Sequence, residues 1–227
     1  MNTKITTNYV ASIIDHTLLK ANATKNDIIK LCEEAKEYGF AAVCVNPYYV
    51  SLAKKSLEKT KIKVATVIGF PLGCTTKTVK IIETRDAIAN GADEIDMVIN
   101  ISALKSGDEM YVLDEIKTIR EASYGKILKV IIETAYLTRE EKIKACKIAK
   151  DAKVDFVKTS TGFATSGATV EDVKLMKSVV GSKIGVKASG GIKDLKTAID
   201  MIKAGATRIG TSSGVSIIKG DKSENQY

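Results

Sequence analysis

The sequence predicts a single-domain α/β fold, a (β/α)₈ barrel in which each strand is followed by a helix. Three observations predict it. One unit recurs along the chain: an amphipathic helix, a glycine and a short apolar strand. Eight such apolar runs occur at intervals of roughly thirty residues, which suits a barrel of this size. No linker or composition break divides the 227 residues, a length that supports one sizeable core.

The eight predicted strands are continuous apolar runs, which are typical of a parallel sheet that helices cover. Eight units favour a closed TIM barrel. An open, doubly wound sheet is the alternative, but no G-x-G-x-x-G turn follows the first strand. The predicted strands are Ile13–Thr17, Phe40–Val45, Ile62–Ile68, Glu94–Ile99, Ile127–Glu133, Asp155–Thr159, Ile184–Ala188 and Thr207–Thr211.

The helices between these strands carry clear start and stop signals. From Asn26 to Tyr38, apolar residues recur with the spacing of one helical face, and Gly39 follows as a stop. The segment from Asp194 to Ala204 repeats the pattern. Thr24, Thr138 and Thr169 each stand three residues before an acidic residue, which indicates helix starts. We expect the barrel to span residues 1–218 and a mobile polar tail to span 219–227.

Composition limits the classes of function. The chain is 44% hydrophobic and 27% charged, which is typical of a globular protein, and its apolar runs are too short to span a membrane. The net charge of +8 comes from scattered lysines, and aromatic residues are only 5%, so we expect no nucleic-acid partner. Four scattered cysteines favour a reducing, cytoplasmic location. With one histidine, the sequence predicts no metal site.

Charged residues interrupt five of the apolar strands. A charged side chain in a parallel strand is costly unless it is paired or neutralised, so these residues are candidates for chemistry at the barrel mouth. Basic and acidic members can offset one another there. They are Asp15 (with Thr17), Asp96, Lys129 (with Glu133), Lys158 and Lys187.

Lys158 and Lys187 occupy equivalent places at the ends of successive strands. Neighbouring strands lie about 4.8 Å apart, so the two ammonium groups should repel each other. Repulsion and burial would both lower a lysine pKa, and a neutral lysine attacks carbonyl groups to form a Schiff base. Asp96 lies between lysines, and two roles remain open for it: a proton shuttle, or a structural ion pair.

Three late loops are rich in small residues and hydroxyls, which let backbone N–H groups approach a phosphate. They follow Lys158, Lys187 and the last strand, where barrels of this kind often bind phosphate. The phosphate-binding candidates are Gly162, Gly190, Gly191, Ile192, Gly210, Ser212 and Ser213. The expected substrate contacts are Asp15, Thr17, Cys44, Lys129 and Thr159. His16 should face away from Asp15 and be structural.

Segments over nearly the whole chain together resemble the deoxyribose-phosphate aldolase family. They include Ile14-Asp-His-Thr-Leu-Leu-Lys20, Glu94-Ile-Asp-Met-Val-Ile-Asn100, Lys129-Val-Ile-Ile-Glu-Thr134, Asp155-Phe-Val-Lys-Thr-Ser-Thr-Gly162 and Gly185-Val-Lys-Ala-Ser-Gly-Gly191. The resemblance implies a Schiff-base aldolase with Lys158 as the nucleophile and with Asp96 and Lys187 as the proton donor and acceptor. It also implies a homodimer, no cofactor, and a mobile tail that ends in a tyrosine, as this chain does at Tyr227. Two readings stay open for Tyr227: a proton relay on a tail that folds over the barrel mouth, or a terminus without a role.

The implied substrate is 2-deoxyribose 5-phosphate, which would be cleaved to glyceraldehyde 3-phosphate and acetaldehyde. Two alternatives stay open at this point. One is a lysine aldolase or transaldolase for another sugar phosphate. The other is a barrel that binds phosphate without catalysis, in which the lysines are only anion ligands. Covalent trapping of a substrate carbonyl on Lys158 separates catalysis from binding.

Overall fold

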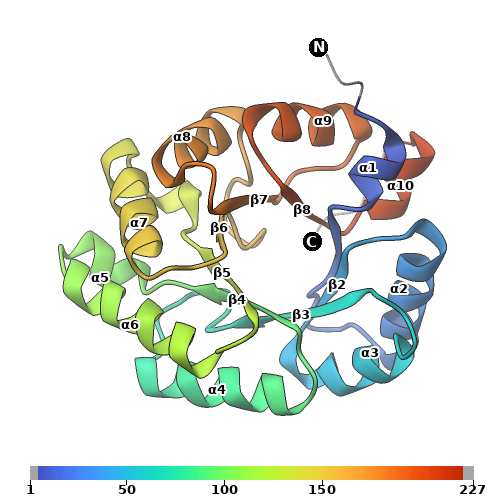
Figure 1. Cartoon of the computed structure of the whole chain (residues 1–227), viewed down its shortest axis with the longest axis horizontal. Coiled ribbons are helices and arrows are strands. Elements are labelled where there is room, and N and C mark those ends of the chain that lie inside the picture. The colour runs from blue at the N-terminus through green and yellow to red at the C-terminus, as the bar shows by residue number, and fades with distance from the viewer. Residues whose placement is uncertain (1–4, 222–227) are drawn as a thin grey trace.

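The computed structural model describes residues 5–221. Within this part of the chain, eight parallel strands close into a barrel in sequence order, and β1 pairs with β8 (Figure 1). This closure excludes the open sheet and confirms the predicted fold. The strands are β1 (Ile14–Leu18), β2 (Ala42–Val45), β3 (Lys63–Ile68), β4 (Glu94–Val98), β5 (Ile127–Ile131), β6 (Phe156–Lys158), β7 (Gly185–Ser189) and β8 (Arg208–Thr211).

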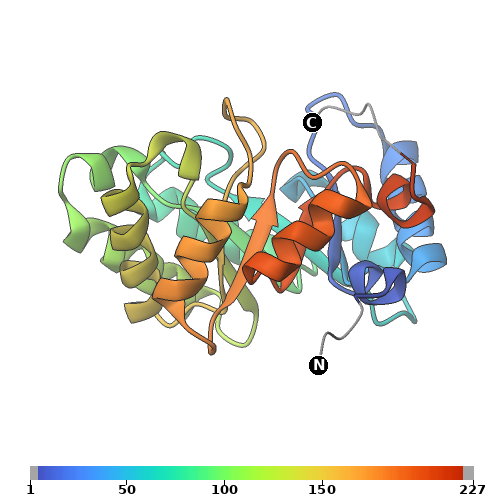
Figure 2. The same cartoon turned by 90° about the horizontal axis from the view of Figure 1, so that it is seen from above.

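Helices form a ring outside the barrel, with α1 beside α10 where the ring closes (Figure 1). In the side view, the loop between β6 and α8 rises at the upper end (Figure 2). The helices are α1 (Thr7–Ala11), α2 (Lys25–Tyr38), α3 (Val50–Ser56), α4 (Lys77–Ala89), α5 (Ile101–Lys105), α6 (Glu109–Ala122), α7 (Arg139–Asp151), α8 (Val170–Val180), α9 (Leu195–Ala204) and α10 (Gly214–Lys219), with short 3₁₀ turns η1 (Pro47–Tyr49) and η2 (Thr134–Tyr136).

The predicted helix signals lie where the helices begin and end. Thr24 and Thr138 form capping boxes at the starts of α2 and α7, and the Thr169 hydroxyl accepts the Asp172 N–H at 3.0 Å. Gly39 ends α2 with φ +66°, a left-handed conformation that favours glycine. These local signals set the lengths of the helices and therefore the place where each chain segment re-enters the barrel.

Two apolar clusters hold the fold together. The larger one fills the space between the strands and the surrounding helices. The smaller one lies on the side of the barrel formed by β1–β3, and its buried members are Leu19, Ala42, Cys44, Ala65 and Val67. The apolar half of the inner face is therefore formed mainly by β2 and β3, whereas the buried charged residues come from β1 and from β4–β8.

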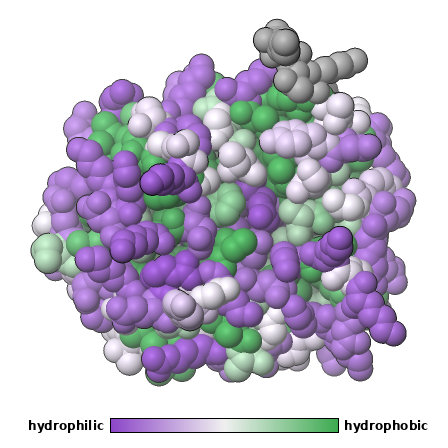
Figure 3. Space-filling view, in the orientation of Figure 1, coloured by the Kyte–Doolittle hydropathy of each residue, from purple (hydrophilic) through white to green (hydrophobic). Residues whose placement is uncertain are grey.

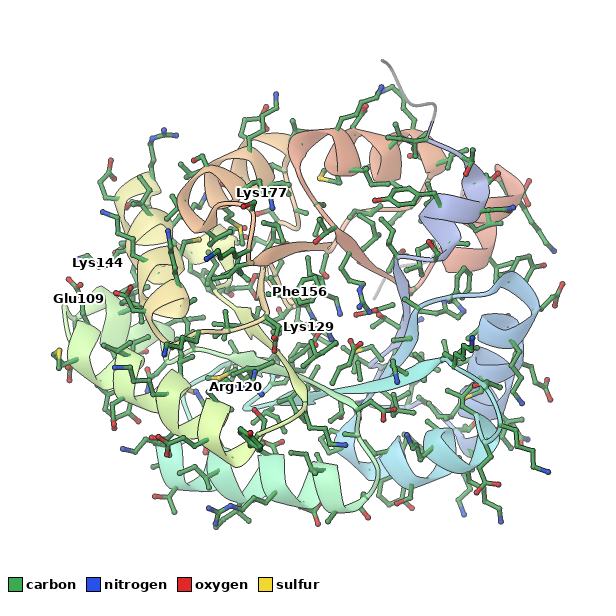
Figure 4. All side chains as sticks on the ribbon, in the orientation of Figure 1. Glu109, Arg120, Lys129, Lys144, Phe156 and Lys177 are labelled. Atoms are coloured by element: carbon green, nitrogen blue, oxygen red, sulfur yellow. The ribbon has the colours of Figure 1, made fainter. Side chains whose placement is uncertain are left out.

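The face of the molecule drawn in Figure 3 is mostly hydrophilic, with apolar side chains in scattered patches. Charged residues on the helices pair with one another there: the Lys144 ammonium lies 2.7 Å from the Glu109 carboxylate, both on the outside of the ring (Figure 4). In residues 5–221, no helix is both long enough and apolar enough to span a bilayer.

The end of the predicted barrel differs slightly from the structure. Lys219, with which the predicted tail begins, is the last residue of α10, and Gly220 caps that helix with φ +81°. The tail from 222 onward, including Tyr227, lies outside the described residues. The domain boundaries at 218 and 219 therefore stay predictions.

Candidate active site

The lysines at the strand ends meet inside the barrel. Lys158 and Lys187 are direct partners in the β6–β7 register, and Asp96 and Lys129 are partners in the β4–β5 register. All four side chains are buried. Figure 4 shows Lys129 near the barrel centre. Parallel strands in register bring these residues together because equivalent positions face the same interior.

Asp96 is the hub of the cluster. Its Oδ2 atom accepts hydrogen bonds from Lys158 Nζ at 2.9 Å and from Lys187 Nζ at 2.8 Å. Its Oδ1 atom accepts one from Lys129 Nζ at 2.6 Å. Burial alone would raise the pKa of Asp96, but the three ammonium groups outweigh it and hold that pKa well below its usual range. Asp96 is therefore an ionised carboxylate that fixes all three lysines.

The three lysines differ in how many carboxylates reach them. Lys129 lies 2.6 Å from Asp96 and from Glu94 and 3.6 Å from Asp15. Lys187 pairs with Asp15 and Asp96, whereas Asp96 is the one carboxylate that pairs with Lys158 among the described residues. Lys158 is therefore the least compensated of the three.

The pKa shifts follow this difference. Burial and the charge of Lys187 lower the pKa of Lys158, and Asp96 offsets only part of that effect. Burial would also lower the pKa of Lys187, but Asp15 and Asp96 outweigh it and raise that pKa. Of the two facing lysines, only Lys158 therefore has a lowered pKa, and the difference arises from the contact of Asp15 with Lys187, which the sequence does not reveal.

Glu94 and Arg208, for which the sequence motifs predicted no role, complete the cluster. Arg208 Nη1 lies 2.7 Å from Asp15 Oδ1 and 3.3 Å from Glu94 Oε2. Glu94 stands two residues before Asp96 on β4, so the alternation of side chains places both inside the barrel. That spacing was the available signal for Glu94.

The described cluster contains four basic and three acidic side chains. With the other groups ionised, a neutral Lys158 leaves three cations against three anions, and the buried cluster carries no net charge. A protonated Lys158 leaves one uncompensated positive charge in the interior, which is costly. The members are Lys129, Lys158, Lys187 and Arg208 with Asp15, Glu94 and Asp96.

The predicted substrate contacts lie at different places around the cluster. Cys44 is buried in the apolar half, where burial raises the pKa of its thiol. The Thr17 hydroxyl donates to the Asp15 carbonyl at 2.8 Å, and Thr17 and Ser212 line a groove of about 400 Å³ beside β1. The Thr159 hydroxyl donates a hydrogen bond to the Ser189 carbonyl of β7 and accepts one from the Ser189 N–H, both at 3.1 Å.

The predicted phosphate loops lie against one another. A Cβ added at Gly190 would lie 3.5 Å from the Gly162 Cα, and both glycines have φ near +85°: +84° and +88°. The Thr211 hydroxyl donates to the Ile192 carbonyl at 2.7 Å and accepts the Ser213 N–H at 2.9 Å. The loops after β6, β7 and β8 therefore form one small-residue surface.

Two glycines in these loops have distinct settings. Gly191 has φ +76°, and a Cβ there would meet nothing within 4 Å, so the conformation and not crowding favours glycine. At Gly210, a Cβ would lie 2.9 Å from Lys187 Cε and 2.3 Å from Ser189 Oγ. Gly210 therefore makes room for Lys187 to cross the barrel.

His16 faces the helix layer, as the alternation along β1 predicted. Its Nε2 atom lies 2.7 Å from Glu34 Oε2 of α2, and its ring centroid lies 5.0 Å from that of Phe40. It therefore does not belong to the ionic cluster. In residues 5–221, no group of three or more His, Cys, Asp or Glu side chains is arranged so that it could hold a metal ion.

A model of the DeoC/LacD family of aldolases matches residues 9–220. The chain belongs to this family. Among its relatives are the deoxyribose-phosphate aldolases of Geobacillus sp. strain WCH70, 58% identical over 97% of this chain and 99% of the relative, and of Thermococcus gammatolerans, 62% identical over 93% and 96%.

A solved aldolase has the same fold. The tetrameric deoxyribose phosphate aldolase of Aeropyrum pernix superposes with a TM-score of 0.88 at 36% identity, over 94% of this chain and 91% of that one. Membership of the aldolase family confirms the resemblance that the sequence motifs indicated. The ionic cluster is accordingly the candidate active site of an aldolase.

Proposed function

We propose that this chain is a Schiff-base aldolase that cleaves 2-deoxyribose 5-phosphate to glyceraldehyde 3-phosphate and acetaldehyde, in deoxyribose phosphate catabolism. The observation that carries the proposal is the asymmetry of the lysines. Lys158 has the lowered pKa, and Lys187 and Lys129 are held as cations by several carboxylates. An aldolase of this class needs one neutral lysine beside groups that stabilise and move charge.

In the proposed mechanism, the neutral Lys158 amine attacks the C1 aldehyde of the open-chain sugar. Loss of water gives an iminium, whose positive charge lies beside the Asp96 carboxylate. The Asp96 carboxylate takes the proton of the C3 hydroxyl through a water, and the Lys187 ammonium stabilises the oxyanion that forms. The C2–C3 bond breaks, its electron pair moves into the iminium to form an enamine, and glyceraldehyde 3-phosphate leaves. Protonation at C2 and hydrolysis release acetaldehyde and restore Lys158.

The small-residue loops support the choice of a phosphorylated substrate. Gly162 and Gly190 approach each other closely, and the Thr211 hydroxyl links the Ile192 carbonyl to the Ser213 N–H by two hydrogen bonds. We assign the phosphate to this surface, in contact with Gly162, Gly190, Gly191, Ile192, Gly210, Ser212 and Ser213. Binding energy from the phosphate would then hold C1 at Lys158. Asp15, Thr17, Cys44, Lys129 and Thr159 stay proposed substrate contacts.

The deciding experiment is borohydride trapping with 2-deoxyribose 5-phosphate, followed by peptide mass mapping. We expect a stable adduct on Lys158 and none in Lys158→Ala. An adduct on Lys187 would mean that the roles of the two lysines are exchanged. Binding of the sugar phosphate without any adduct would favour the non-catalytic barrel. Parallel assays with fructose phosphates test the alternative of another sugar-phosphate aldolase.

Three further assignments belong to the same proposal. The four cysteines are unpaired thiols, which supports a reducing, cytoplasmic location. We propose a homodimer, although the relative from Aeropyrum pernix is described as a tetramer. Light scattering on the purified chain distinguishes a dimer from a tetramer.

The proton-transfer role proposed for Tyr227 is tested by the variant Tyr227→Phe.

A further inference from the structure

Glu133 lies two residues after the end of β5 and has no role in the mechanism above. Its side chain is 1% exposed, and its backbone is left-handed, with φ +54°. The other described non-glycine residues with positive φ, Lys59 and Lys153, are exposed. A buried residue in this strained conformation persists only where its surroundings fix it, and such positions concentrate at functional sites.

The Glu133 carboxylate holds the loop that follows the nucleophile. Its Oε2 atom accepts the backbone N–H of Thr161 at 3.1 Å and also the Thr161 hydroxyl. The Thr161 Oγ1 atom in turn accepts the Phe163 N–H at 3.0 Å. One carboxylate therefore fixes the loop over its first turn, beginning three residues after Lys158.

The backbone around Glu133 is tied to the nucleophile itself. The Ile132 N–H donates to the Lys158 carbonyl at 3.1 Å, and the Thr134 N–H donates to the Thr159 carbonyl at 2.9 Å. Glu133, the residue with positive φ, stands between Ile132 and Thr134, the two residues that donate these hydrogen bonds. Glu133 therefore connects the residue that would attack the sugar with the glycine loop that would bind its phosphate.

The other carboxylate oxygen is not used by the fold. Among the described residues, Glu133 Oε1 is buried without a hydrogen-bond partner, and the same holds for the Ser160 and Thr134 hydroxyls. Buried polar atoms in native proteins are normally paired. A cluster of unpaired atoms around one loop indicates that this loop is built for more than its own stability.

We propose that Glu133 is a positioning residue that fixes the loop of residues 159–162 relative to Lys158. It thereby sets the distance between the reacting carbonyl and the phosphate. This inference rests on the proposed function, because it assigns the phosphate to that loop. A misplacement of about 1 Å in such a loop costs on the order of 100-fold in rate.

The test compares two substrates, 2-deoxyribose 5-phosphate and 2-deoxyribose without phosphate. The measured quantity is the ratio of their kcat/KM values, because this ratio does not depend on the fraction of enzyme that is folded. We expect Glu133→Ala to lower the ratio about 100-fold. Glu133→Gln keeps a carbonyl oxygen that can accept from Thr161, so it should retain much more of the ratio.

Thr161 provides a second, independent variant. Thr161→Val removes the hydroxyl donor at nearly constant volume and should also lower the ratio, whereas Thr161→Ser should restore it. The matched control is Glu83→Gln, because Glu83 Oε2 likewise accepts a loop N–H, that of Gly69, at 2.8 Å. The Gly69 loop follows β3 and not Lys158, so the control should keep the wild-type ratio.

The outcomes separate this inference from the proposed function. An unchanged ratio in both Glu133→Ala and Thr161→Val overturns the positioning role, even if both variants lose stability. An equal fall in the ratio for Glu83→Gln also overturns it, because any loop carboxylate would then have the same effect. Failure of the unaltered chain to cleave 2-deoxyribose 5-phosphate overturns the proposed function itself.

Discussion

At the scale of single residues, Lys158 is distinguished by its partners and not by its burial. All three cluster lysines are buried, but Lys158 contacts one described carboxylate, whereas Lys187 contacts two. Desolvation acts against each ammonium, so the number of compensating carboxylates decides which lysine becomes neutral. The proposed nucleophile therefore differs from the other two lysines in having fewer carboxylate partners, which the sequence alone does not display.

Lys187→Leu removes the positive charge at the position that faces Lys158 in the β6–β7 register. We expect the pKa of Lys158 to rise, since the like charge of Lys187 disfavours the protonated form. The rate of cyanoborohydride trapping with acetaldehyde, measured against pH, reports this pKa directly. An unchanged pH profile in a folded variant would rule out the electrostatic role of Lys187.

Asp96→Asn separates the two roles that remain open for Asp96. The carboxylate raises the pKa of Lys158, so its removal should leave Lys158 more neutral and able to form adducts with acetaldehyde near pH 7. If Asp96 also moves protons, cleavage of the sugar phosphate should fall by about 100- to 10,000-fold. Retained adduct formation with retained cleavage would leave Asp96 as a structural ion pair.

At the scale of elements, β1 and β4–β8 each contribute one or two charged side chains to the cluster, and the neighbouring strands must leave space for them. Lys187 crosses from β7 over the backbone of β8, where Gly210 has no side chain. From the sequence, Gly210 is predicted to contact phosphate because small residues in the late loops let backbone N–H groups approach it. The crossing of Lys187 could not be predicted, because it depends on how far β8 is displaced relative to β7.

Gly210→Ala should displace Lys187 and lower kcat/KM by about 100-fold, because the added Cβ would lie 2.9 Å from Lys187 Cε. Gly39→Ala is the matched control. It places the same methyl group at the end of α2, where φ is +66° and nothing lies within 4 Å. The control should cost about 1–2 kcal/mol of stability without loss of activity. Equal activity of the two variants would show that β8 tolerates the methyl group.

At the scale of the whole molecule, local signals sufficed for the fold. Apolar runs and capping residues such as Thr24 and Thr138 predicted the order of the elements, with strand ends displaced by one or two residues. The pairing of Asp15 with Lys187 was not predictable, since it joins β1 to β7 across the closed barrel. Alternation along one strand places a side chain inside, but only closure decides which inward side chains meet.

The buried ion pairs that barrel closure brings together predict how the stability of the protein responds to acid. Lysine charges hold the pKa values of Asp15 and Asp96 below the ordinary value of about 3.9. Their contribution to stability is therefore complete above about pH 4 and is lost as the pH falls toward the folded-state pKa values. Protonation of Asp96 also leaves the buried lysines uncompensated. We expect the free energy of unfolding to fall by a few kcal/mol, roughly, between pH 5 and pH 2.

Two buried glutamates act in the opposite direction. Burial raises the pKa values of Glu115 and Glu133. Each therefore adds to the free energy of unfolding as the pH falls through its folded-state pKa. This gain in stability is complete below about pH 4.3, the ordinary pKa of glutamate. Of these four residues, only Asp15 and Asp96 continue to change the free energy of unfolding at lower pH, and both lower it. Urea unfolding from pH 7 to pH 2 should therefore show a maximum on the acid side of neutrality, followed by a steep decline. Stability that stays constant down to pH 2 would contradict an ionised Asp15–Asp96 pair at the centre of the barrel.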